Sequence, residues 1–237
     1  MIFSVLHRLK RWDDIIRLCP DKDHHLRYFG LWKIRALAAR GDVDDAVNLA
    51  DRLTEDRWAY RDYTREAERI LRECGRNDEA YTRYALPRSV EGTYLAHYRR
   101  LKKDYPSYNP ERILDDLLSA HPEKPGAWFA AIRREGFLDR AADLARNYPV
   151  NPNTLLKAAE DTRESHPDFA LDVASSAIRW IIEGYGYDMG APEAAAAWML
   201  LRGIAEPLGR LPEWREKIRL TISGNKNAEA VMRLIGD

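Results

Sequence analysis

The stretch GDVDDA at residues 41–46 recurs as GRNDEA at residues 75–80 and as GFLDRA at residues 136–141. Each copy has glycine first, an acidic residue fourth and alanine sixth. Looser copies begin at residues 10, 165 and 190, so successive starts lie 25 to 34 residues apart except for one gap of 61. We expect that gap to hold two units joined by a degenerate turn near residues 104–108. A pattern that returns at this spacing predicts a helical repeat protein.

Each residue type that recurs in the hexapeptide has a structural reason. Glycine after an amphipathic run adopts the left-handed conformation that ends a helix. The acidic residue then lies in the first turn of the next helix, where the helix dipole favours a negative charge. Alanine one turn later lets two antiparallel helices approach closely. The flanks agree, because apolar residues recur at three- and four-residue spacing over residues 31–38 and 43–53. The hexapeptide therefore predicts helix–turn–helix units that stack to bury their apolar faces.

The rest of the chain is also predicted to be helical. Proline follows a capping residue at Asn109-Pro110 and Asn151-Pro152, and helix starts of the same kind occur at residues 191–193 and 211–214. No stretch alternates apolar and polar residues like a strand. We therefore predict an all-α fold, a right-handed α-solenoid of stacked antiparallel helix pairs with about 13–15 helices. Residues 1–237 are expected to form a single array, with a bend or sub-boundary near residues 86–109.

Composition excludes several classes of function. The 237 residues carry 38 Lys+Arg and 38 Asp+Glu, so no whole-chain field attracts nucleic acid or an anionic membrane. A chain that is 45% hydrophobic and 32% charged is expected to fold, and no apolar run reaches the length of a membrane span. The first twelve residues predict no secretory leader. With only two cysteines, the chain is expected in the reducing cytoplasm.

The glycine turns at residues 41 and 75 resemble those of the tetratricopeptide repeat. Ala46 and Ala80 match the small residue between the two helices of that family. The first-helix signature is missing, and Trp58 stands where the family has its closing proline. This resemblance implies a fold of stacked helix pairs and implies no particular ligand.

Residues 94–190 resemble a second group, the uncharacterised helical-repeat regions of bacterial proteins that sometimes carry a SWIM-type zinc finger elsewhere. The resemblance rests on residues 125–131, 151–155, 167–171 and 184–188. The chain has neither the cysteines nor the spacing of the zinc finger itself. What this resemblance implies is a non-catalytic helical scaffold of bacterial type.

No set of residues predicts catalysis, a cofactor or a metal site. Cys19 with His24 and His25 is the only cluster of metal-binding residue types, and adjacent histidines rarely both face one ion. We interpret it as a turn between helices. Cys74 precedes a turn glycine at a helix end, where the dipole disfavours a thiolate. The glycine-rich loop at residues 184–190 lacks the lysine of a phosphate-binding loop, and we expect it to reverse the chain between two helices. The protein is therefore expected not to be an enzyme.

Two segments are candidates for contact with a partner. Residues 94–108 combine basic side chains with tyrosines, which is typical of surfaces that track a nucleic-acid backbone and stack on bases. The same spacing also fits an amphipathic helix with a solvated basic side. The tyrosines of the glycine-rich loop either pack under the turn or offer an aromatic contact. The candidate partner-binding residues are Tyr94, Tyr98, Arg99, Arg100, Lys102, Lys103, Tyr185 and Tyr187.

The function that these features favour is a protein-interaction scaffold, with a partner protein or peptide bound in a groove of the helical repeat. The alternative is a helical-repeat protein that binds nucleic acid through residues 94–108. No membrane partner is expected, and the oligomeric state is left open. Seven tryptophans are many for this length, and one or two exposed in a groove would mark a binding hot spot.

Overall fold

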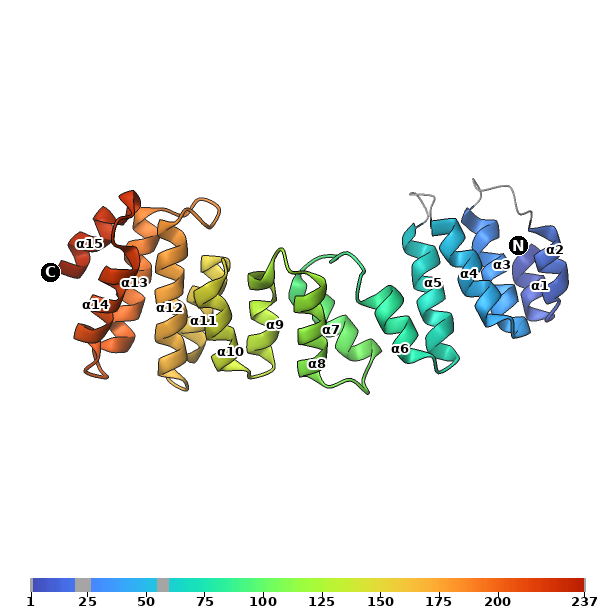
Figure 1. Ribbon diagram of the computed structural model, residues 1–237, viewed down its shortest axis with the longest axis horizontal. Helices are drawn as coiled ribbons and strands as arrows, with labels where there is room; N and C mark the ends of the chain where they lie inside the picture. The colour runs from blue at the N-terminus through green and yellow to red at the C-terminus, as the bar shows by residue number, and fades with distance from the viewer. Residues whose placement is uncertain (1, 20–26, 55–59, 237) are drawn as a thin grey trace. The chain divides into compact units, whose positions relative to one another are not determined.

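The computed structural model describes residues 2–19, 27–54 and 60–236, and all of their regular structure is helical (Figure 1). These residues form fifteen α-helices and three short segments of 3-10 or π-helix, and they contain no strand. The prediction of an all-α fold is confirmed. The chain divides into two compact units, Met1–Ser89 with Asp104–Ser107, and Val90–Lys103 with Tyr108–Asp237. A single array over residues 1–237 stays a prediction.

Unit 1 consists of helices that pack against their neighbours in the chain. α3 contacts α2 and α4, and α4 contacts α5 in turn. The helices of unit 1 are α1 (Ile2–Arg8), α2 (Trp12–Leu18), α3 (Arg27–Arg40), α4 (Val43–Thr54), α5 (Tyr60–Glu73), α6 (Asn77–Ala80) and the π-helical η1 (Tyr81–Ala85).

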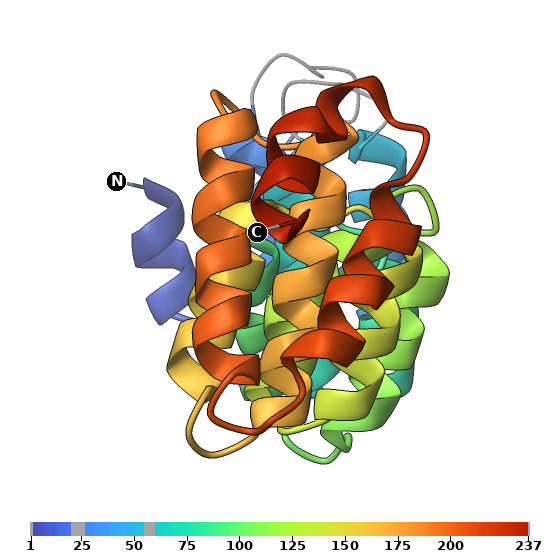
Figure 2. The ribbon, with the colours of Figure 1, turned by 90° about the vertical axis from the view of Figure 1, so that its left-hand side faces the viewer.

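Unit 2 repeats this pattern of neighbour packing. α12 packs between α11 and α13, and Figure 2 shows α12, α13 and α14 side by side. The first helices of this part of the chain are α7 (Tyr94–Asp104), α8 (Pro110–Ala120), η2 (Pro125–Trp128), α9 (Phe129–Arg134) and α10 (Leu138–Asn147). The remaining helices are α11 (Pro152–Thr162), α12 (Pro167–Ile182), α13 (Ala191–Ala205), α14 (Leu211–Ile222), η3 (Lys226–Ala228) and α15 (Glu229–Gly236).

The recurring hexapeptide has one geometry at five of its six predicted positions. The second helix always begins at the third residue, and the N–H of the sixth residue donates to the carbonyl of the second. The glycines at residues 41, 75 and 136 have positive φ, as the motif requires. The sixth residue has no solvent exposure in any of the five, because it faces the neighbouring helix. These sixth residues are Ile15, Ala46, Ala80, Ala141 and Ala170.

The copy predicted at residues 190–195 is out of register. The structure also contains two copies that the sequence pattern did not identify. At residue 190 the helix begins one residue early, with Ala194 donating to the Gly190 carbonyl, so the match of residues 190–195 to the motif was wrong. The degenerate turn expected near residues 104–108 lies at residues 108–113, where Ile113 donates to the Asn109 carbonyl. Another copy begins at Gly209, which has a φ of +67°.

The predicted caps form where proline begins a helix. The Asn109 side chain accepts a hydrogen bond from the N–H of Arg112 (2.6 Å), and Asn151 accepts one from Asn153 (3.0 Å). Each cap satisfies a backbone donor that the first helical turn leaves without an acceptor. The short polar-proline dipeptides therefore fix where α8 and α11 begin.

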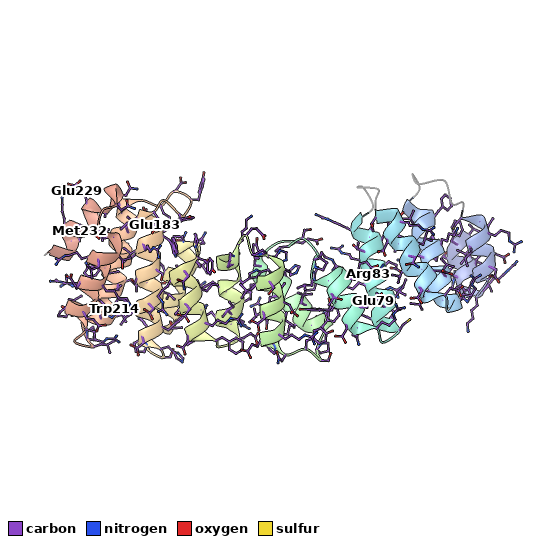
Figure 3. The ribbon with its side chains drawn as sticks, viewed as in Figure 1. Glu79, Arg83, Glu183, Trp214, Glu229 and Met232 are labelled. Atoms are coloured by element: carbon purple, nitrogen blue, oxygen red, sulfur yellow. The ribbon has the colours of Figure 1, made fainter. Side chains whose placement is uncertain are left out.

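The acidic residue of the hexapeptide pairs with an arginine near the next copy. Asp13 lies 2.6 Å from Arg40, and Asp44 lies 2.5 Å from Arg76. Glu79, the fifth residue of its copy, forms an ion pair of 3.0 Å with Arg83 of η1. Figure 3 labels both residues. Each exposed pair contributes at most about 1 kcal/mol to the free energy of unfolding. The pairs therefore recur with the repeat but add little to its stability.

A buried polar cluster holds residues 104–107 in unit 1. The Tyr105 hydroxyl donates to Glu68 (2.9 Å), and Arg88 donates to the other oxygen of the same carboxylate. All three side chains are buried, and the Tyr105 ring packs edge-on against Tyr81. A buried carboxylate needs such partners, because an unpaired charge would be costly away from water. Arg88 and Tyr105 of this cluster lie within the predicted boundary region of residues 86–109, and Glu68 lies outside it.

Candidate functional site

Only part of the predicted basic and aromatic segment lies at the surface. Tyr98 is 0% exposed, and His97 and Leu101 are also buried, so this side of α7 belongs to the core of unit 2. The expectation that Tyr98 contacts a partner therefore needs correction. The physical reason is helical periodicity, which turns residues three and four apart toward the same side.

The basic residues of α7 mostly face solvent. Arg99, Lys102 and Lys103 are exposed, and Lys102 forms an ion pair of 2.6 Å with Glu135. Arg100 is half-buried and lies 3.4 Å from a ring nitrogen of His97. The segment is therefore an amphipathic helix with a basic outer side. Its central tyrosine does not stand among the exposed cations, as a base-stacking surface would need.

Tyr94 and Tyr185 are brought together, although they are far apart in the sequence. Tyr94 begins α7 and packs edge-on against Trp128, with 4.8 Å between ring centroids. Tyr185 is 43% exposed and packs edge-on against Trp180 at 5.4 Å, in the loop that follows Glu183 (Figure 3). Both tyrosines line one groove. Tyr187 is 91% exposed and does not line it.

The groove has a volume of about 810 Å³, which is within the usual range for ligand pockets. It lies in unit 2, where α7, the continuous segment of η2 and α9, and α11 all begin, and the Tyr185 loop adds one wall. Its lining residues are mostly apolar or aromatic: Thr93, Tyr94, Leu95, Glu123, Lys124, Pro125, Gly126, Ala127, Phe129, Ala130, Pro149, Val150, Asn151, Thr154 and Tyr185.

A close backbone approach shapes the floor of the groove. A Cβ atom on Gly126 would lie 2.8 Å from the carbonyl carbon of Pro149 and 3.1 Å from a methyl group of Val150. Only glycine fits here, because the obstacle includes the backbone of the facing connection. Phe129 is buried just after this turn. The sequence thus places η2 directly against the connection that leads into α11.

The N-terminus of α7 places hydrogen-bond donors at one edge of the groove. In α7 the His97 N–H donates to the Thr93 carbonyl (3.0 Å), and the Ala96 N–H donates to the Thr93 hydroxyl (3.1 Å). The N–H groups of Tyr94 and Leu95 precede these bonds and have no acceptor within the helix. Because Thr93, Tyr94 and Leu95 all line the groove, these two donors and the positive end of the α7 dipole lie at its edge.

The charged side chains of the groove are Glu123 and Lys124, as far as the described residues go. Their charges cancel, and both are exposed. The described lining includes no cysteine, histidine or serine. The arrangement can bind and orient an uncharged, acceptor-rich group.

Within the described ranges, the predicted cysteine and metal candidates add no second site. His24 and His25 lie outside the described residues, and the described part of the chain holds no cluster of three metal-binding side chains. Cys19 is buried, and burial raises the pKa of its thiol, although Lys33 opposes the shift. A thiol that stays protonated is a poor nucleophile and metal ligand. Cys74 is exposed.

A smaller hollow of about 450 Å³ lies in unit 1. It is lined in part by Arg35 and Arg69, and both guanidinium groups bond to Glu66 at 2.8 and 2.5 Å. Burial alone would raise the pKa of Glu66, but the hydrogen bonds from the two arginines outweigh it and lower that pKa. Because these charges already satisfy one another, a charged ligand would have to break existing pairs. The groove in unit 2 is therefore the stronger candidate.

The tryptophans of unit 2 are core residues. Trp128, Trp180, Trp198 and Trp214 are all buried, and they do not supply the exposed hot spot considered from the sequence. Trp58 lies outside the described residues. Tyrosine provides the aromatic surface of the groove instead.

Comparisons with protein-family models, with curated proteins and with solved structures found no match. Of the helices in the described ranges, none is both long enough and apolar enough to cross a bilayer.

Proposed function

We propose that this protein is a non-catalytic scaffold that binds a segment of a partner protein in the groove lined by Tyr94 and Tyr185. The observation that carries this proposal is the convergence of two predicted contact tyrosines on an apolar groove of about 810 Å³. Mostly apolar pockets with a few placed polar groups are the usual binding sites of proteins. The partner would be met in the cytoplasm, as the cysteine content favours.

The repeated turn supports a right-handed α-solenoid of the tetratricopeptide type as the scaffold. Within unit 1, acidic residues of one turn pair with arginines close to the next, at Asp13–Arg40 and Asp44–Arg76. Within unit 2, Asp115 of α8 pairs with Arg140 of α10. In a repeat array each unit contacts its neighbours, so ion pairs between successive copies are the contacts we expect of one.

The second candidate function is contact with nucleic acid through Arg99, Lys102 and Lys103, which are exposed on one helix. Without surface tyrosines among them, such binding would be mainly electrostatic and would fall steeply with salt. Replacing these three residues and Arg100 by alanine would abolish a salt-dependent shift of RNA or DNA. No shift at low salt would dismiss this candidate.

Site-specific photo-crosslinking in the native source tests the scaffold proposal. A crosslinking residue at Thr154 lies in the groove, and one at Leu220 provides a control on an exposed position of α14 in the same unit. We expect a partner protein to crosslink from the Thr154 position and not from the Leu220 position.

The purified partner should then bind the full chain, and Ala130→Glu should weaken that binding. Ala130 lines the groove, whereas the matched control Ala196→Glu is an exposed helical position outside the lining. Equal affinity of both variants, or turnover of a small molecule by the chain alone, would contradict the proposal.

A further inference from the structure

The start of α7 offers hydrogen-bond donors to an occupant of the groove. Most peptide segments would instead need acceptors there for their own backbone N–H groups. The N–H groups of Tyr94 and Leu95 lie at the first turn of α7, and both residues line the groove. The complementary occupant has backbone carbonyl groups free to accept these donors. It also has few N–H groups of its own to leave unsatisfied.

The known modes of peptide recognition differ in what they ask of the receptor. Strand addition needs an open sheet edge, and the described residues contain no strand. Recognition of phosphorylated or acidic motifs needs clustered arginines, whereas the described lining has Lys124 beside Glu123. A helical occupant uses most of its carbonyls internally, and only those of its last turn could accept from the donors at α7. These three modes fit the groove poorly.

An extended polyproline II segment meets all of these conditions. Its backbone makes no internal hydrogen bonds, and proline has no N–H. Segments of this kind bind grooves lined by aromatic side chains, such as those of Tyr94 and Tyr185 here. The cancelled charges of Glu123 and Lys124 favour an uncharged contact segment.

We propose that the groove binds an extended, uncharged, proline-rich segment of the partner protein. This inference rests on the proposed scaffold function and adds the chemistry of the partner. The rings of Tyr94 and Tyr185 pack against proline and apolar side chains, and the donors at the start of α7 bond to the carbonyls of the segment. Because polyproline II is already extended in solution, the segment loses little conformational entropy on binding.

Binding of short blocked peptides to the full chain tests this inference. The probe alternates proline with leucine, and the comparison peptide has the same length and leucine content with alanine in place of proline. Calorimetry gives the affinities. We expect the proline peptide to bind at least about tenfold more tightly than the alanine peptide.

Two pairs of variants locate the binding. Tyr185→Ala removes a wall of the groove, whereas Tyr187→Ala removes a more exposed tyrosine two residues away that does not line it. We expect the first to weaken binding of the proline peptide by about tenfold or more and the second to leave it unchanged. Ala130→Glu against Ala196→Glu provides the second pair. Circular dichroism and thermal unfolding confirm that each variant folds.

Three results would overturn the inference. Tighter binding of the helix-forming alanine peptide would assign the groove to a helical partner and would leave the scaffold function standing. Self-association that is lost in Ala130→Glu would assign the groove to a second copy of the chain. Failure of the proline peptide to bind, or equal binding to wild type and Tyr185→Ala, would refute the proposal that the groove binds a proline-rich segment. The crosslinks from the Thr154 position would then decide the scaffold function separately.

Discussion

Substituting Gly126 by alanine tests the backbone approach that shapes the groove. The added Cβ would lie 2.8 Å from the carbonyl carbon of Pro149, with the carbonyl oxygen closer still. Because non-bonded carbon atoms normally stay about 3.5–4.0 Å apart, η2 or the facing connection must move by about 1 Å. Neither obstacle is the end of a flexible side chain, so rotation of a side chain cannot relieve the overlap.

The cost follows from the stiffness of these two segments. Overpacking a well-packed region usually costs about 1–3 kcal/mol, and a clash with backbone belongs at the upper end of that range. Moving the connection would also disturb the cap that Asn151 makes at the start of α11. We therefore expect Gly126→Ala to lower the free energy of unfolding by about 3 kcal/mol. For a chain of this length that corresponds to a Tm lower by about 6–12 °C.

Gly203→Ala is the matched control, because it makes the same chemical change in the same unit. Gly203 lies within α13, and a Cβ there would meet no atom within 4 Å. Alanine favours a helix over glycine by up to about 1 kcal/mol, so this variant should raise the Tm by about 2–4 °C.

Thermal unfolding followed by tryptophan fluorescence measures both variants. The buried tryptophans of unit 2 include Trp128, which lies in η2 two residues after Gly126, so the signal is sensitive to this region. A Tm for Gly126→Ala within about 1 °C of the wild-type value would refute the close approach and with it the described floor of the groove.

Three further predictions concern the ion network, the helix packing and the buried tyrosines. Glu66→Gln should lower the free energy of unfolding at neutral pH by about 1–2 kcal/mol, because it removes a buried carboxylate bonded to Arg35 and Arg69, which are partly exposed. The pKa of Glu66 is lowered in the folded state, so its ionised form stabilises the fold fully above the unfolded pKa near 4.3. The difference in free energy of unfolding between the variant and the wild type, measured with urea, should therefore shrink as pH falls through the folded pKa. Ala46→Leu should cost about 1–3 kcal/mol in chemical unfolding because the site is fully buried, whereas Ala196→Leu at an exposed site should change stability by less than about 0.5 kcal/mol. Burial raises the pKa of three tyrosines, helped by nearby carboxylates. An absorbance titration should therefore show three tyrosines that ionise only well above the usual pKa of about 10, and the stability that depends on their neutral form should be lost as pH rises above about 10. These three are Tyr84, Tyr98 and Tyr105.

The helical character of the chain and the positions of most of its turns could be predicted because their signals are local. The turn that begins at Gly41 needs only six residues, whose conformational preferences act within one helix end. The same local rule explains the errors. The copy at residue 190 matches the sequence pattern, but the Gly190 N–H donates to the Glu193 carboxylate in a cap, and the helix begins one residue early. The copy at Gly209 has Trp214 where the others have a smaller residue, so the hexapeptide pattern did not identify it.

The groove could be predicted only in part, because it is made by segments distant in the chain. Tyr94 and Tyr185 were candidates for their residue type, but no local pattern shows that they line one hollow. Phe129, Val150 and Thr154 were missed altogether. The one sequence signal near these three residues is a proline or polar residue shortly before each of them. Such residues mark where a helix begins, but they do not show which helix starts line the same groove. Tyr98 was misplaced because a basic and aromatic composition outweighed the helical periodicity that buries it.

Hydrogen–deuterium exchange of the full chain, with and without the proline–leucine peptide, tests the binding groove most directly. The account predicts that the peptide slows exchange at residues 93–95, 125–130 and 149–154, and that the outer side of α7 around Arg99 and Lys103 exchanges as before. Protection confined to segments outside these three ranges, or no protection at a saturating peptide concentration, would contradict it.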